Sequence, residues 1–159
     1  DDFMIARSEF GRRFSDASVA TRRALFEYGM IDLERFRACL GTFKTSTRPF
    51  ESVGYNRVTG EVDVASTYDF TKRILLVDGV FLFHPKLTDD LFDRRILLTG
   101  SRSVIDARRV AREKARWGSD YFPEDHQDSY FRYVLEAFDY YLSAHHPADR
   151  ADLVLDMTS

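Results

Sequence analysis

The stretch Arg73-Ile-Leu-Leu-Val-Asp-Gly-Val-Phe-Leu-Phe83 decides which class of fold the sequence predicts. Its residues 74–77 have no polar side chain on either face, which is typical of a parallel strand buried on both sides. Such strands occupy the middle of α/β domains, and open α/β sheets bind ligands at the carboxyl ends of their strands. Asp78 and Gly79 follow at that end, and Gly lets a backbone or a ligand approach closely. An ordinary turn after the strand is the alternative interpretation.

The whole chain has the composition of a soluble domain. It has 159 residues, of which 44% are hydrophobic and 31% are charged, so it is large enough to build a core. We therefore expect a single domain over residues 1–159. The 23 basic and 26 acidic residues give a net charge of −3, which argues against nucleic acid or a membrane surface as a dedicated partner.

The cysteine and histidine content limits the compartment and the metal chemistry. Cys39 is the single cysteine, so we expect no internal disulfide and predict a cytoplasmic protein. The four histidines lack paired cysteines, and no metal site is predicted. The sequence shows neither a signal peptide nor a long apolar run. It begins at Asp1 without an initiator Met, which suggests a piece cut from a longer chain.

Helical and extended patterns alternate along the chain. Helices are predicted over residues 32–40, 103–117 and 129–144, the first with Asp32 as its N-cap and Gly41 as its stop. Besides residues 74–77, short strands are predicted over 95–99 and 152–156, and an antiparallel ribbon over 55–62. Strands that alternate with helices imply parallel βαβ units, so the predicted fold class is α/β.

The strongest charge signal lies in residues 94–116, which contain eight Lys or Arg and only two acids. In a helix, Arg109, Arg112 and Arg116 step along one face, and Arg108 lies beside Arg109. Arginines in this arrangement can bind phosphate oxygens with bidentate geometry, so a small phosphate ligand is one interpretation. A solvated helix face is the other.

Acidic and aromatic side chains elsewhere would suit a hydroxyl-bearing ligand. A carboxylate of Asp1 or Asp2, placed at a strand end, would serve as a general base toward a hydroxyl, although two such acids can also be merely solvated. The candidate acceptors for sugar hydroxyls are Glu27, Glu51 and Asp78, and the candidates for stacking on a ring are Phe50 and Tyr55.

In their order and spacing, five segments resemble the uridine kinase and phosphoribulokinase branch of the P-loop kinases. The segments are Asp1-Asp2-Phe3, Ile74-Leu-Leu-Val-Asp-Gly-Val-Phe81, Asp93-Arg-Arg-Ile-Leu-Leu98, Asp106-Ala-Arg-Arg-Val-Ala-Arg-Glu113 and Ala151-Asp-Leu-Val-Leu-Asp156. The resemblance implies a three-layer P-loop kinase fold around a parallel sheet. It also implies transfer of the terminal phosphoryl group of ATP, with Mg²⁺, to a hydroxyl of a nucleoside or related small molecule.

The resemblance also implies roles for individual residues. Asp1 would accept the proton of the acceptor hydroxyl, with Asp2 as the less favoured choice, and Glu27 falls near a family acid that binds the acceptor sugar. Phe50-Glu51 stands where the family often has Tyr-Asp in the acceptor pocket, and this departure leaves the acceptor open. The remaining matches are Asp78, as the acid after the central strand, and Arg108, Arg109 and Arg112, as the lid that closes over the phosphates.

One part of the family pattern has no counterpart in this sequence. The family's nucleotide cradle, a strand and a Gly-rich loop ending in Gly-Lys-Ser/Thr, precedes the Asp-Asp-Phe motif. We therefore expect this chain to lack ATP binding of the family type and its sheet to be incomplete at the N-terminus. A preceding segment or a second copy in a homodimer would complete the sheet. The alternative function is a non-catalytic remnant that acts as an interaction or oligomerisation domain.

Overall fold

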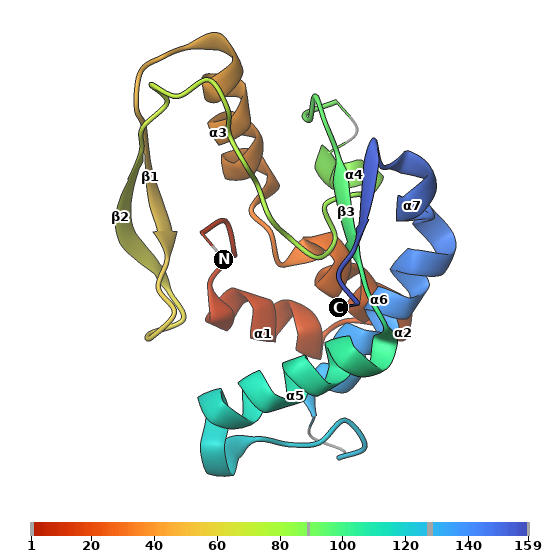
Figure 1. Cartoon of the computed structure of the whole chain (residues 1–159). Helices are drawn as coiled ribbons and strands as arrows, with labels where there is room; N and C mark the ends of the chain where they lie inside the picture. Colours follow the sequence, from red (N-terminus) through yellow and green to blue (C-terminus); the bar gives the residue numbers. More distant parts are fainter. Residues whose placement is uncertain (1, 89, 127–128, 159) are drawn as a thin grey trace. The chain divides into compact units, whose positions relative to one another are not determined.

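A computed structural model describes residues 2–88, 90–126 and 129–158 (Figure 1). The structure contains both helices and strands, so the predicted α/β class is confirmed in its broad sense. The strands form two small sheets. The chain divides into two compact units, residues 1–91 and residues 92–159.

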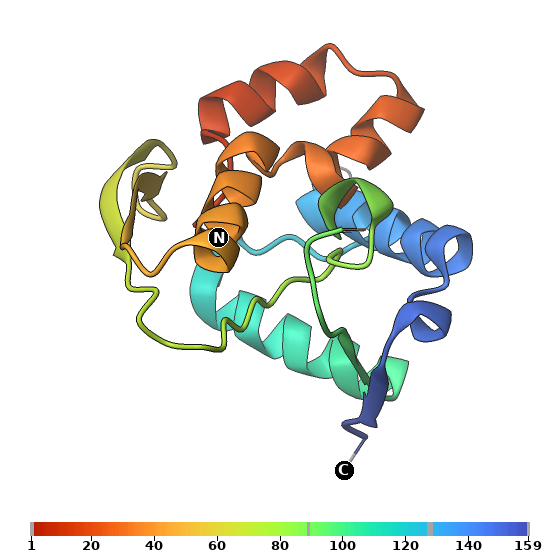
Figure 2. The ribbon, with the colours of Figure 1, turned by 90° about the horizontal axis from the view of Figure 1, so that it is seen from above.

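The first unit is helical with one antiparallel ribbon. Its helices are α1 (Arg7–Ser15), α2 (Val19–Ala24), the π-helical turn η1 (Leu25–Gly29), α3 (Leu33–Thr45) and α4 (Pro85–Thr88). Strand β1 (Phe50–Tyr55) pairs antiparallel with β2 (Val62–Tyr68). An antiparallel ribbon is therefore present, but the prediction misplaced it: of residues 55–62, residues 56–61 form the turn, and the two strands lie on either side. Figures 1 and 2 both show this ribbon alongside α3.

Helix α3 begins as predicted but ends later. The side chain of Asp32 accepts a hydrogen bond from the backbone N–H of Arg35 at 3.0 Å, so Asp32 is the N-cap. The predicted stop at Gly41 is wrong, because the helix continues through this residue. The extra turn carries Phe43, whose ring packs edge-on against Phe70 at 5.4 Å, so apolar packing outweighs the low helix propensity of glycine.

The predicted buried strand over residues 74–77 is wrong. Residues 74–79 take no regular secondary structure, and the side chains of Ile74 and Leu76 are 77% and 86% exposed. A strand needs a neighbour to satisfy its backbone N–H and C=O groups, and the described strands pair only within the two small sheets. Asp78, which follows, is consequently an exposed residue of an irregular segment and does not end a strand.

The second unit confirms the other predicted helices and strands, with small shifts at their ends. It contains β3 (Ile96–Thr99), α5 (Arg102–Trp117), the 3₁₀ turn η2 (Gly118–Asp120), α6 (Tyr130–His145), α7 (Pro147–Arg150) and β4 (Leu153–Asp156). Strands β3 and β4 pair in parallel, with Ile96 opposite Leu153 and Thr99 opposite Asp156. Between them the chain makes the helical crossover that a parallel pair requires.

The buried apolar side chains lie mainly in the first unit. Phe26 is 1% exposed, and its ring packs edge-on against those of Phe10 and Phe14 of α1 at 5.5 and 5.9 Å. The other buried apolar residues of this unit are Leu25, Phe36, Cys39, Leu40, Phe70, Phe83 and Leu87. Among the described residues, no helix is long and apolar enough to span a bilayer.

We expect the N-cap of α3 to make a measurable contribution to stability. Replacing Asp32 with Ala removes the acceptor for the Arg35 N–H and should lower the free energy of unfolding by about 1 kcal/mol. Asp32→Asn keeps a capping oxygen and should stay within a few tenths of a kcal/mol of the original chain, roughly. Urea unfolding followed by circular dichroism measures both. Equal losses in the two variants would show that charge, and not capping, is what Asp32 supplies.

Candidate functional site

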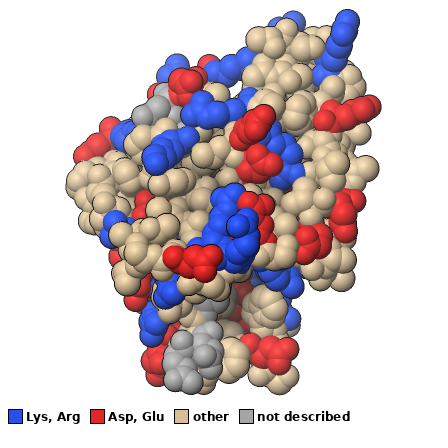
Figure 3. Space-filling model, turned by 180° about the vertical axis from the view of Figure 1, so that it is seen from behind, with Lys and Arg blue, Asp and Glu red and all other residues tan. Residues whose placement is uncertain are grey.

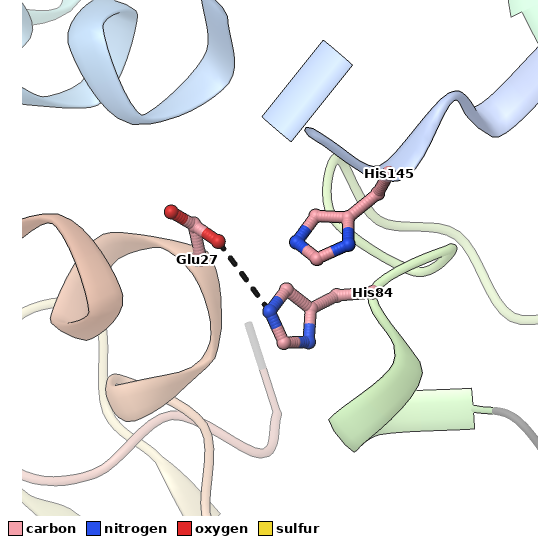
Figure 4. Close-up of side chains that lie close together, drawn as sticks. All are labelled: Glu27, His84 and His145. Carbon is pink, nitrogen blue, oxygen red and sulfur yellow. Dashed lines mark ion pairs between the residues drawn. The ribbon is translucent and has the colours of Figure 1, made fainter. Parts of the chain in front are cut away.

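A buried acid–histidine pair lies within the first unit (Figure 4). Glu27, in the π-helical turn η1, places Oε2 at 3.4 Å from Nε2 of His84. The two residues are 3% and 6% exposed. The second carboxylate oxygen, Oε1, lies 3.4 Å from Nε of Arg23, one helical turn earlier. A carboxylate that is excluded from water needs charged or polar partners, and Arg23 and His84 supply them here.

The imidazole of His84 is fixed from its other side. Its Nδ1 accepts a hydrogen bond from the backbone N–H of Lys86 at 3.1 Å. The ring of Tyr28 lies 4.7 Å from the imidazole, between ring centroids, and the ammonium group of Lys86 donates to the Tyr28 hydroxyl at 3.0 Å. Neighbouring residues of η1, Glu27 and Tyr28, therefore both contact His84.

A second acid of this unit, Asp2, lies against a phenol. The hydroxyl of Tyr68 donates to Oδ2 of Asp2 at 3.2 Å, and the ring of Phe3 stacks on that of Tyr68 at 5.7 Å. Burial, followed by the charge and the hydrogen bond of Asp2, raises the pKa of Tyr68 to about 12. Burial and the same carboxylate raise the pKa of the Cys39 thiol to about 11, which makes it a poor nucleophile.

Aromatic rings continue from Tyr68 in a row that contains one predicted stacking residue. The rings of Phe50 and Tyr68 are 6.1 Å apart, and Phe70 lies 6.5 Å from each of them. We call Phe3, Tyr68, Phe50 and Phe70 the aromatic row. The other predicted stacking residue, Tyr55, is at the opposite end of β1 from Phe50.

The structure separates the remaining predicted acceptor residues from the aromatic row. Glu51 is exposed, and because it follows Phe50 in a strand its side chain points to the opposite face. Asp78 is exposed in the irregular segment described above. Asp1, the predicted general base, lies outside the described residues. Of the acids that the sequence singled out, the structure therefore gives Glu27 and Asp2 specific partners.

The predicted lid arginines all lie on α5 but in different surroundings. Arg109 is only 13% exposed, forms ion pairs with Asp106 and Glu124, and places its guanidinium 5.4 Å from the ring centre of Phe131. Arg112 is 73% exposed, and Arg108 is exposed as well. Arg112 also forms an ion pair with the buried Glu113, its Nε lying 3.3 Å from Oε1. An anion from solution would therefore compete with Glu113 for Arg112 and with Glu124 for Arg109.

Charged side chains of both signs are interspersed on the face that Figure 3 shows. The blue Lys and Arg side chains lie beside red Asp and Glu side chains and do not gather into one basic surface. Mixed charge on this face argues against a long polyanion as its ligand.

Sequence reasoning missed three residues of the candidate site. His84, Arg23 and Tyr68 were not among the predicted site residues. Arg23 was recognisable in principle, because it stands four residues before Glu27 in a helical segment. Nothing in the sequence pairs Glu27 with a histidine so far along the chain.

Within the first unit, Glu27 and His84 offer one carboxylate oxygen and one imidazole nitrogen, which are both common metal ligands. The nature of the site rests on the two acids and the aromatic row. No protein-family model matches the chain, and no curated protein matches it either. The likeness to uridine kinases stays a prediction from the sequence.

We expect the phenol of Tyr68 to report on Asp2. The negative charge of Asp2 disfavours the phenolate, so Asp2→Asn should lower the pKa of Tyr68 from about 12 toward 10, the ordinary value. Burial remains in the variant, so the value should stay above the ordinary one. Titration by phenolate absorbance measures the change, and Tyr68→Phe identifies which of the tyrosine signals belongs to Tyr68. An unchanged titration in Asp2→Asn would show that the two side chains are apart in solution.

Proposed function

We propose that the chain is the acceptor-binding and lid portion of a small-molecule kinase of the uridine kinase type, with a three-layer P-loop kinase fold. The reaction is transfer of the terminal phosphoryl group of ATP to a hydroxyl of a nucleoside or a related molecule. The observation that carries the proposal is the placement of Asp2 at the aromatic row, hydrogen-bonded to Tyr68. A carboxylate beside flat aromatic rings suits a ligand that combines hydroxyl groups with a flat base.

The acceptor half of the reaction is assigned to the first unit. In this assignment Phe50 stacks on the base, and Glu27 accepts hydrogen bonds from sugar hydroxyls. Asp1 is the general base that takes the proton of the attacking hydroxyl, as the family resemblance implies, and Asp2 is the second choice. Asp2 is the one whose surroundings support a catalytic carboxylate, because it already accepts a hydroxyl hydrogen bond. Glu51, Tyr55 and Asp78 have weaker support, because each is exposed or distant from Phe50 along its strand.

The phosphate half is assigned to α5 of the second unit. Arg108 and Arg112 are exposed and fit an incoming polyphosphate, while Arg109 would exchange its partner Glu124 for a phosphate oxygen. When bound, ATP with Mg²⁺ supplies the phosphoryl group and neutralises part of its charge. The arginines stabilise the negative charge that spreads over the transferring group.

A second candidate function has an observation of its own. Strands β3 and β4 carry apolar side chains on both faces, and Leu98 of β3 is 63% exposed. Strands of this composition are normally covered, so an interaction or oligomerisation domain that pairs with another chain is the alternative. It predicts self-association or partner binding and no affinity for nucleosides.

Binding of unmodified nucleosides to the purified chain separates the two candidates. By isothermal titration calorimetry we expect uridine or a related nucleoside to bind, and Phe50→Ala to weaken binding by roughly tenfold or more, since stacking of a base is worth about 1–3 kcal/mol. Val58→Ala, at an exposed residue of the same ribbon, is the matched control and should leave affinity unchanged.

The same chain, given labelled ATP and Mg²⁺ with the nucleoside that binds, tests the transfer itself. Because we expect this chain to lack ATP binding of the family type, turnover should be low or absent. Where turnover is measurable, Asp1→Asn should lower it by about two to four orders of magnitude, the usual contribution of a general base. If no nucleoside or sugar that is tested binds, the kinase proposal is contradicted and the interaction domain is favoured.

A further inference from the structure

The buried pair of Glu27 and His84 is more elaborate than sugar binding by a lone acid requires. Acids that only contact a ligand at a surface are solvated, whereas Glu27 is 3% exposed and has a nitrogen group 3.4 Å from each oxygen. One of these groups, the Arg23 guanidinium, is always charged, and the other is an imidazole that is itself buried. This arrangement indicates that Arg23 and His84 fix the orientation of the Glu27 carboxylate.

The hydrogen bonds fix the protonation pattern of His84. Its Nδ1 accepts from the Lys86 N–H at 3.1 Å, so this nitrogen carries no proton. The ring proton must then be on Nε2, which is the atom that faces Glu27 Oε2 at 3.4 Å. A neutral imidazole that donates from Nε2 is the form that orients a neighbouring carboxylate.

The backbone around both residues is arranged to hold this contact. Glu27 lies in a π-helical turn, a rare widening of a helix that is frequent at functional sites. The N–H of His84 donates to the carbonyl of Phe81 at 2.8 Å, and its carbonyl accepts from the N–H of Leu87 at 2.9 Å. The ring of Tyr28 packs against the imidazole ring of His84, with the two ring centroids 4.7 Å apart. Neither side chain of the pair therefore depends on a loose segment for its position.

We propose that His84 is a positioning residue, which donates from Nε2 to hold the Glu27 carboxylate in the orientation that binds a hydroxyl of the acceptor. His84 acts through Glu27 and is not itself a catalytic group. The part of this inference that concerns ligand binding rests on the proposed function. The part that concerns the tautomer and the orientation of the pair does not.

The tautomer is tested without any ligand. Nitrogen NMR of the histidine side chains in the intact chain, with His84→Gln to assign the signal, should show the His84 ring neutral with its proton on Nε2. A proton on Nδ1, or on both nitrogens near neutral pH, would overturn the inference, whatever the chain binds.

The positioning role is tested with uridine as the probe and calorimetry as the readout. Glu27→Gln and His84→Leu should each weaken uridine binding about tenfold or more, a change equal to about 1.4 kcal/mol. His84→Gln, whose amide can still donate toward Glu27, should recover most of the affinity. The double variant Glu27→Gln/His84→Leu should bind no more weakly than Glu27→Gln, because His84 acts only through Glu27. His126→Leu removes a histidine of the other unit that stacks on Phe122 and is the matched control.

The outcomes separate this inference from the proposed function. Uridine binding that His84→Leu leaves unchanged, or losses that add fully in the double variant, would overturn the positioning role and leave the proposed function standing. If neither uridine nor another nucleoside binds the original chain while the Nε2–H signal is present, the proposed function and the ligand-binding role are both wrong. Thermal unfolding of each variant shows whether a weaker binder is still folded at the temperature of the titration.

Discussion

In the first unit, the buried carboxylate of Glu27 requires charged or polar partners around it. Burial of a carboxylate costs several kcal/mol unless charged or polar partners are placed around it. Here the partners come from sequence neighbours and from a distant segment, since Arg23 lies on the same helical stretch and His84 precedes α4. The same contact therefore joins η1 to the start of α4, so one electrostatic requirement ties together parts of the chain that are far apart in sequence.

The second organising feature is the line of rings that begins at Phe3. These rings bury Tyr68, and this burial contributes to its raised pKa. The hydrogen bond between the Tyr68 hydroxyl and Asp2 also holds the start of the chain against the β1–β2 ribbon. Apolar packing thereby positions an acid that would otherwise be solvated. The two features have a common physical basis, because in each an acid is held by a specific donor next to an aromatic ring.

Local patterns predicted much of the secondary structure but little of the candidate site. Capping, alternation and periodicity act between residues that are near neighbours in the sequence. They predicted the N-cap at Asp32, the existence of the ribbon, α5, α6 and the two strands of the parallel pair. The strand expected at residues 74–77 failed because composition reports what a segment would bury and not whether a neighbour is there to pair with it. Glu27 and Phe50 were predicted as site residues and do have specific surroundings, whereas their partners His84 and Tyr68 were missed. Those partners are distant in sequence, and no periodic pattern connects them.

An NMR titration of the isotopically labelled chain with uridine tests the central claim most directly, namely that a nucleoside binds at Asp2 and the aromatic row. The account predicts concentration-dependent shifts in the signals of Asp2, Phe50 and Tyr68, with the signals of the exposed turn around Val58 unmoved. Absence of any shift at saturating nucleoside, or shifts confined to α5, would contradict it.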